Sequence, residues 1–195
     1  MTTVFYRPKK IDLDQRIKTF LAAKKCLWKD KNVPEVDGKI LFDVILQKNY
    51  RYALEIGTST GHSGIWIAWA LSKTGGKLIT VENDQSRHLQ ALGNFEKAGV
   101  SGCIDARLAD AHQLIPELDS AFDFIFCDAD KIGYKNYLQA VLPKLKPGGC
   151  FAAHNVTDTQ MEGIQEFLDY LHGLPELDTD IDRSSGSGVS ISFKR

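Results

Sequence analysis

The chain has 195 residues, of which 43% are hydrophobic and 25% are charged, and its formal net charge is −1 at pH 7. This length suits one α/β domain over residues 1–195 that buries its core without disulfides or metals. The near-neutral charge gives no reason to expect nucleic acid or an anionic membrane as a partner. The sequence shows no apolar leader, no membrane-length apolar stretch and no C-x-x-C pair, which predicts a cytoplasmic protein with reduced thiols.

Two amphipathic helices are predicted within residues 1–50, ahead of the first strand. Apolar residues at helical spacing run from Leu13 to Leu27, after an irregular start. Asp37 is placed to N-cap a second helix that has Leu41 and Ile45 on its apolar face. We expect these two helices to cover the ligand-binding loop that follows them.

Beyond residue 50, short apolar runs alternate with helical patterns, as in an open parallel α/β sheet. The predicted strands are residues 52–56, 77–81, 104–108, 122–127, 150–153, 178–182 and 189–193. The predicted helices start near residue 65 and then cover residues 84–98, 111–118, 134–145 and 158–171. Lys146-Pro147-Gly148-Gly149 predicts a stop and turn before the fifth strand. The expected fold is a Rossmann-like, doubly wound, mostly parallel seven-stranded sheet with an antiparallel C-terminal strand.

The first strand, loop and helix together have the composition of a ligand-binding unit. The stretch reads YALEIGTSTGHSGIWIA, and Gly57 and Gly61 bracket its loop. In such units backbone N–H groups and a helix N-terminus hold the polar part of a nucleotide-like ligand. Glu55 at the strand tip would repel a pyrophosphate but would pair with an ammonium group, and Ser59 replaces the second glycine of G-x-G-x-x-G. This pattern favours S-adenosylmethionine (SAM) over NAD as the cofactor.

Polar residues end five successive predicted strands, at the edge where open α/β sheets bind ligands. Glu82 ends the second strand, where a carboxylate would take both ribose hydroxyls. Asp110 and Ala111 follow the third strand and would lie beside an adenine ring. Any one of these acids is also read as a helix cap or a solvated loop charge. The repetition at five strand ends favours a ligand site.

A second cluster is predicted next to the cofactor. It contains Asp128, Lys131, His154 and Asn155. A carboxylate, an imidazole and an amide carbonyl could together hold a divalent cation. Close to a metal and partly desolvated, Lys131 would have a lowered pKa and act as a general base. The alternative is that Lys131 is a solvated loop lysine and that Asp128 caps the next helix.

Most of the chain, from about Asp37 to the C-terminal GVSISFK, resembles a known enzyme family. The segments that carry the resemblance are ALEIGTSTGHSG, LITVEND, LADAHQLIP, FDFIFCDADKIGY and LKPGGCFAAHN, of which CDADK is the most specific. They resemble the cation-dependent, SAM-dependent O-methyltransferases related to catechol and caffeoyl-CoA O-methyltransferases. The resemblance implies a class I methyltransferase fold and methyl transfer to a hydroxyl of a small, catechol-like acceptor. Dimerisation is common in that family, which leaves a homodimer open.

The resemblance also implies roles for individual residues. Those implied to hold SAM are Glu55, Gly57, Thr58, Ser59, Gly61, Ser63, Glu82, Asp110, Ala111 and Asp128. Asp128 matches the first metal-ligand aspartate of the family, and Lys131 matches the lysine proposed as its base. With His154, these two residues are the catalytic candidates, and Asp128, His154 and Asn155 are the metal candidates.

His154 is a departure from the family, whose metal site has an adjacent Asp-Asn pair at this point. Neutral imidazole removes one negative charge and one hard oxygen ligand, so affinity for Mg²⁺ should drop. An Asp-His-Asn set suits Mn²⁺, Fe²⁺ or Zn²⁺ better. It is equally open that no metal binds and that His154 acts as the base or orients the acceptor hydroxyl. The loop after Asn155, VTDTQ, is short, so the acceptor preference of the family does not carry over.

Two other functions stay open at this stage. One is a metal-independent methyltransferase with a different acceptor nucleophile such as nitrogen, which would be indifferent to chelators. The other is a Rossmann-type protein that binds SAM or another nucleotide without turnover. An NAD-dependent dehydrogenase is disfavoured by Glu55 and by the spacing of the glycines.

Overall fold

The computed structural model describes residues 12–25 and 32–195. Two helices come first, α1 (Leu13–Lys24) and α2 (Glu35–Lys48). The predicted continuation of the first helix to Leu27 lies outside the described residues. The prediction that Asp37 caps the second helix is wrong, because α2 begins directly after Pro34. A proline suits the start of a helix, since its φ is already helical and it has no N–H to satisfy. Asp37 therefore lies in the first turn.

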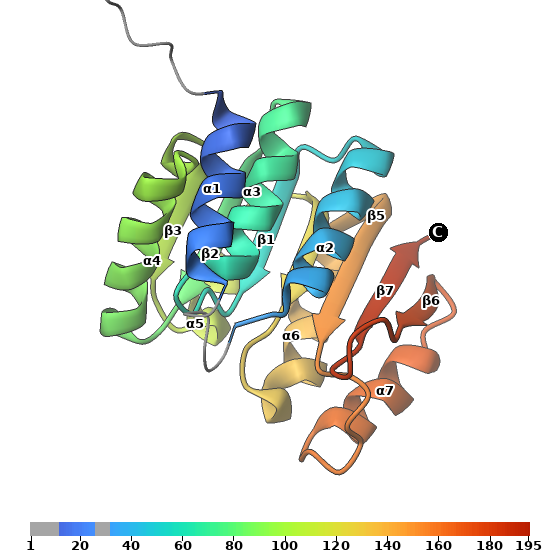
Figure 1. Ribbon diagram of the computed structural model, residues 1–195. Helices are drawn as coiled ribbons and strands as arrows, with labels where there is room; N and C mark the ends of the chain where they lie inside the picture. Colours follow the sequence, from blue (N-terminus) through green and yellow to red (C-terminus); the bar gives the residue numbers. More distant parts are fainter. Residues whose placement is uncertain (1–11, 26–31) are drawn as a thin grey trace, which may run out of the picture.

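A single seven-stranded sheet forms the centre of the fold, in the order β3-β2-β1-β4-β5-β7-β6 (Figure 1). Its strands are β1 (Tyr52–Ile56), β2 (Lys77–Glu82), β3 (Ile104–Leu108), β4 (Phe122–Cys127), β5 (Leu145–His154), β6 (Leu177–Asp182) and β7 (Val189–Lys194). The pairs from β3 to β5 are parallel, and β7 runs antiparallel to both of its neighbours. The doubly wound sheet with one antiparallel C-terminal strand is confirmed.

Helices cover both faces of this sheet (Figure 1). The remaining helices are α3 (His62–Thr74), α4 (Gln85–Ala98), α5 (Ala111–Glu117), α6 (Tyr134–Val141) and α7 (Ile164–His172). Helices α1 to α4 pack on one face and α5 to α7 on the other, over separate apolar clusters. Within the described ranges, no helix combines the length and apolar character needed to cross a membrane.

The central strands alternate their side chains between the two helical layers. On β4, Phe124 and Phe126 face the layer of α2 and α3, whereas Ile125 and Cys127 face the layer of α5 to α7. All four are fully buried. Full burial of a large apolar side chain contributes about 1.5–3 kcal/mol, so the middle of the sheet is the most strongly held part of the fold. The ligand-binding edge is anchored there.

The starts of β5 and α7 differ most from the predicted ones. Strand β5 begins at Leu145, so the Pro-Gly-Gly segment continues the strand, and a shift in its register with β4 absorbs the irregularity. Helix α7 begins at Ile164, because Gly163 with φ of 88° interrupts the helical path. A Cβ on Gly163 would lie 2.5 Å from the carbonyl oxygen of Lys131. The glycine thus lets the segment before α7 contact the loop after β4.

Candidate active site

A cavity of about 630 Å³ lies at the carboxyl ends of the parallel strands. Its volume is typical of small-molecule pockets. The predicted site residues that line it are Gly57, Ser59, Glu82, Asp110, Ala111, Asp128, Lys131, His154 and Asn155. The structure therefore brings both predicted clusters into one cavity. Glu55, Thr58, Gly61 and Ser63 are not among the lining residues.

The glycine loop depends on the absence of side chains at two positions. Gly57 has φ of 94°, and a Cβ there would lie 2.7 Å from the carbonyl oxygen of Asp128. Gly61 also has φ of 94°, and its Cβ would lie 2.7 Å from the ring of Phe95. Only glycine adopts this conformation without strain. The loop after β1 therefore contacts the backbone that follows β4, which joins the two halves of the cavity.

Glu82 is fixed at the edge of the cavity by backbone N–H groups. Its carboxylate accepts hydrogen bonds from the N–H of Ser59 at 2.7 Å, of Asp84 at 3.0 Å and of Asn83 at 3.1 Å. The side chain is held in one position and lines the cavity. A fixed carboxylate is a suitable acceptor for the hydroxyls of a ribose.

Glu55 lies behind the glycine loop and is fully buried. Its Oε2 accepts a hydrogen bond from the Thr80 hydroxyl at 2.5 Å, and Thr80 also bonds the Thr58 hydroxyl. Burial raises the pKa of Glu55 to about 7, although hydroxyl groups of Ser63 and Thr80 oppose the rise. Among the described residues, Glu55 Oε1 and Ser59 Oγ are buried without a hydrogen-bond partner. Unpartnered buried oxygens at this loop fit a ligand that brings N–H donors, as the ammonium group of SAM does. The SAM-binding role of these residues stays a prediction.

Asp110 is both a helix cap and a residue of the cavity wall. Its carboxylate caps α5 by accepting a hydrogen bond from the N–H of His112 at 2.8 Å. Asp110 and Ala111 also line the cavity. The cap orients the start of α5 toward the place where an adenine is expected.

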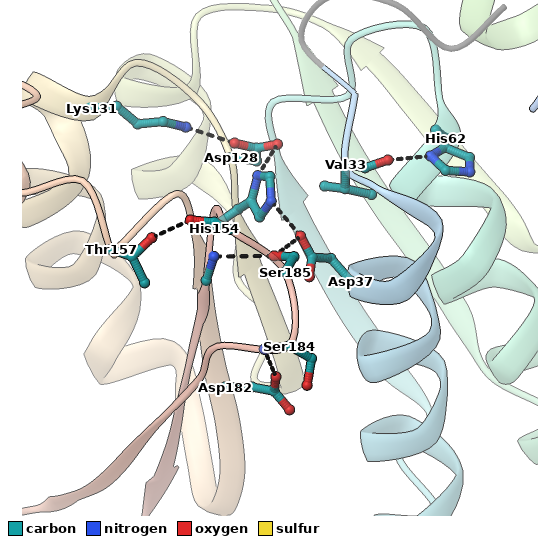
Figure 2. Close-up of polar contacts among 12 residues, drawn as sticks. Val33, Asp37, His62, Asp128, Lys131, His154, Thr157, Asp182, Ser184 and Ser185 are labelled. Atoms are coloured by element: carbon teal, nitrogen blue, oxygen red, sulfur yellow. Dashed lines mark hydrogen bonds and ion pairs between the residues drawn. The ribbon is translucent and has the colours of Figure 1, made fainter. Parts of the chain in front are cut away.

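The second half of the site is centred on the carboxylate of Asp128 (Figure 2). Lys131 Nζ lies 2.6 Å from Asp128 Oδ1, and His154 Nδ1 lies 3.3 Å from Asp128 Oδ2. The side chain of Lys131 is 15% exposed, which rules out a solvated loop lysine. Asp128 does not cap the following helical turn, because Asp130 does so by accepting a hydrogen bond from the N–H of Gly133.

Two residues of this cluster escaped the sequence reasoning, Asp37 and Tyr134. Asp37 is buried, and its Oδ2 lies 2.8 Å from His154 Nε2 and accepts a hydrogen bond from the Ser185 hydroxyl at 2.9 Å (Figure 2). The Tyr134 hydroxyl accepts a hydrogen bond from Lys131 at 2.7 Å and donates one to the His154 carbonyl at 3.0 Å. Tyr134 lies inside the CDADKIGY segment, which carries the family resemblance, so the sequence offered a signal for it. Asp37 has no such signal, because its partner is 117 positions away.

These contacts set the charge states of the cluster. Burial alone would lower the pKa of His154, but the carboxylates of Asp128 and Asp37 outweigh it and raise that pKa to about 9. Burial, together with Asp128, raises the pKa of Tyr134 well above its usual value. These contacts favour a protonated histidine and a neutral tyrosine at neutral pH.

The metal role predicted for Asp128, His154 and Asn155 stays a prediction. A metal-bound imidazole must present a lone pair. Nε2 of His154 is hydrogen-bonded to Asp37, whereas Nδ1 lies 3.3 Å from Asp128 Oδ2 and is buried without a hydrogen-bond partner among the described residues. Asp128 Oδ1 is already paired with the Lys131 ammonium group. In the part of the chain that the structure describes, no group of three or more histidines, cysteines or acids is placed to hold a metal ion.

Curated relatives of the chain are O-methyltransferases. The chain is 40% identical over 107 residues to a catechol O-methyltransferase from Niastella koreensis, a match that covers 53% of this chain and 48% of that protein. It is 32% identical over 129 residues to a caffeoyl-CoA O-methyltransferase from Populus kitakamiensis, covering 64% of this chain and 54% of that protein. The matched region thus spans about half the length of these relatives.

Solved structures show the same fold over nearly the whole chain. The O-methyltransferase TomG from Streptomyces achromogenes, in complex with SAM, superposes with a TM-score of 0.80 at 26% identity, covering 93% of this chain and 90% of that one. The O-methyltransferase from Bacillus cereus, in complex with SAH, gives a TM-score of 0.78 at 28% identity, covering 96% and 92%. The family described as O-methyltransferase matches residues 10–161, which is most of the chain. The chain therefore belongs to the O-methyltransferase family.

Proposed function

We propose that the protein is a SAM-dependent O-methyltransferase that acts on a small hydroxylated acceptor, with catechols as the first class to test. The observation that carries the proposal is the cavity in which the Glu82 carboxylate and the Asp128 cluster face one space. The names of the catechol and caffeoyl-CoA relatives support a hydroxyl acceptor. The bound SAM of the TomG structure supports the cofactor.

The glycine-loop side of the cavity is the proposed cofactor site. Glu82 would accept hydrogen bonds from the ribose, Asp110 and Ala111 would border the adenine, and the loop with Glu55 would hold the methionine part. When bound, SAM supplies a methyl group on a positively charged sulfur, ready for in-line displacement. The chain itself supplies orientation, which is the largest part of catalysis in such a transfer.

The Asp128 side is the proposed acceptor site. The acceptor O–H bond must break while its oxygen bonds to the methyl carbon and the S–C bond opens. His154 places positive charge at the cavity edge, where it stabilises the oxygen as its proton leaves. We assign the amine form of Lys131 as the proton acceptor, so that the proton of the acceptor hydroxyl becomes an N–H of Lys131. Its side chain is 15% exposed, whereas that of His154 is 4% exposed.

The cofactor assignment is tested by calorimetric titration of SAM into the wild-type protein and the Glu82→Gln variant. We expect affinity to fall by roughly 10- to 100-fold, because the amide cannot reproduce the charged acceptor at the ribose. Glu117→Gln, on the exposed side of α5, is the matched control and should bind as the wild type does. Equal affinity in Glu82→Gln and the wild type would contradict the assignment.

A further inference from the structure

We propose that His62 is a positioning residue for the cofactor, because it ties the chain segment ahead of α2 to the glycine loop. We call this segment, residues 32–34, the covering segment. Held in place by His62, it forms one wall of the proposed cofactor site and slows the release of SAM and of S-adenosylhomocysteine. The inference rests on the proposed function for its assignment of that site to SAM.

The covering segment and the glycine loop border the same space. Asn32 and Pro34 of the segment line the cavity, and so do Gly57 and Ser59 of the loop. The Thr60 hydroxyl, also in the loop, donates a hydrogen bond to the side-chain oxygen of Asn32 at 3.1 Å. A ligand held by the loop therefore lies against the covering segment as well.

His62 makes a shorter contact with the same segment. It is the first residue of α3, and its side chain is buried. Its Nδ1 lies 2.7 Å from the carbonyl oxygen of Val33, and its Nε2 accepts a hydrogen bond from the indole N–H of Trp66 at 3.2 Å (Figure 2 shows the first contact). The imidazole therefore links the covering segment to the first turns of α3.

These partners select one form of the His62 ring. A carbonyl oxygen accepts and does not donate, so Nδ1 carries the proton that bonds to Val33. An indole N–H only donates, so Nε2 carries the lone pair that faces Trp66. Burial lowers the pKa of His62, although the Val33 carbonyl and Glu35 oppose the fall, which favours the same neutral ring. The contact with the covering segment is thus specific to the Nδ1–H tautomer.

The groups on either side of this contact are themselves fixed. A Cβ on Gly38 would clash with the indole of Trp66, so α2 and α3 contact closely where the indole meets His62. On the loop side, Asn94 of α4 donates a hydrogen bond from its amide to the carbonyl oxygen of Thr60 at 2.8 Å. His62 therefore orders the covering segment against a rigid support before the cofactor binds. A wall that is already ordered costs less free energy on binding, and a ligand behind it leaves only when the wall moves.

The inference is tested by the rate at which S-adenosylhomocysteine dissociates from the protein, measured by stopped-flow competition. His62→Leu removes the hydrogen bonds to Val33 and Trp66, so release should be roughly 10-fold faster. His62→Gln offers an amide N–H to Val33 and an amide oxygen to Trp66, so its rate should stay within about 3-fold of the wild type. His172→Leu, at the exposed end of α7, is the matched control and should not change the rate. A folded His62→Leu variant with the wild-type rate would overturn the inference, and so would a His62→Gln variant that releases as fast as His62→Leu.

The contacts of His62 are tested separately in the wild type without cofactor, so this measurement does not depend on whether a variant folds. ¹⁵N NMR of the histidine rings should show His62 with a proton on Nδ1 and none on Nε2 at about pH 7.5. A protonated ring, or a ring with its proton on Nε2, would refute the proposal. A failure of the proposed cofactor site is a different result, because it would appear as no binding of S-adenosylhomocysteine to the wild type.

Discussion

The two halves of the cavity are built in different ways. On the cofactor side, the hydrogen bonds that hold Glu82 and Glu55 join residues at most 25 positions apart. On the acceptor side, His154 is held by Asp37, which lies 117 positions away. The cofactor side can therefore be recognised from a local sequence motif. The acceptor side forms only after the sheet and its helices have assembled, so substitutions there act through the tertiary structure.

The largest effect is expected where the two halves meet. Gly57→Ala should lower the free energy of unfolding by about 2–4 kcal/mol and abolish SAM binding, because its Cβ would strike the backbone of Asp128. Gly75→Ala is the matched control. That glycine also has positive φ, of 72°, but a Cβ on it would meet nothing within 4 Å. It should cost about 1 kcal/mol and leave SAM affinity unchanged, as measured by denaturant unfolding and calorimetry.

On the acceptor side, the ion pairs of His154 should make the free energy of unfolding depend on pH. The folded-state pKa of His154, about 9, lies above its unfolded value of 6.5. Stability from this group is therefore complete below about pH 6.5 and is lost as the pH rises through about 9. Unfolding of the wild type and of His154→Asn should be measured across this range. The difference between them should shrink as the pH rises, and a difference independent of pH would contradict the assigned charge.

On the cofactor side, two variants separate the capping role of Asp110 from its role in binding SAM. Asp110→Ala and Asp84→Ala each remove an N-cap hydrogen bond, at the starts of α5 and α4 respectively. Each should lower the free energy of unfolding by about 1 kcal/mol. Only Asp110 lines the cavity, so only its variant should also weaken SAM binding, by roughly 3- to 10-fold. Equal SAM affinity in the two variants would make Asp110 a cap alone.

Much of the fold was predictable because its signals are local. The period of apolar residues located all seven strands, and the residues at the strand ends located nine positions of the cavity wall. Where boundaries were wrong, a tertiary contact had overridden a local signal. The Pro-Gly-Gly segment forms an irregularity within β5, between the pairs that Leu145 and Cys150 make with β4. Gly163 delays the start of α7, because the chain contacts the Lys131 loop there.

Asp37 shows why the acceptor half was less predictable. An acid near the start of a helix is read as a cap, and no local pattern tells a cap from the partner of a distant histidine. His154 was identified as a departure from the family, but its charge depends on two carboxylates that come from α2 and from the end of β4. Buried charge pairing is a property of the assembled structure, and a single sequence does not encode it at neighbouring positions.

The most direct test of the account is turnover. The protein is incubated with SAM and a panel of catechols, with and without added Mg²⁺ or Mn²⁺, and methylated product and S-adenosylhomocysteine are measured by mass spectrometry. The account predicts equal amounts of both products from the wild type, and at least about 100-fold less from Lys131→Ala, which still binds SAM. Binding of SAM with no methylated product from any acceptor, with or without added Mg²⁺ or Mn²⁺, would contradict it.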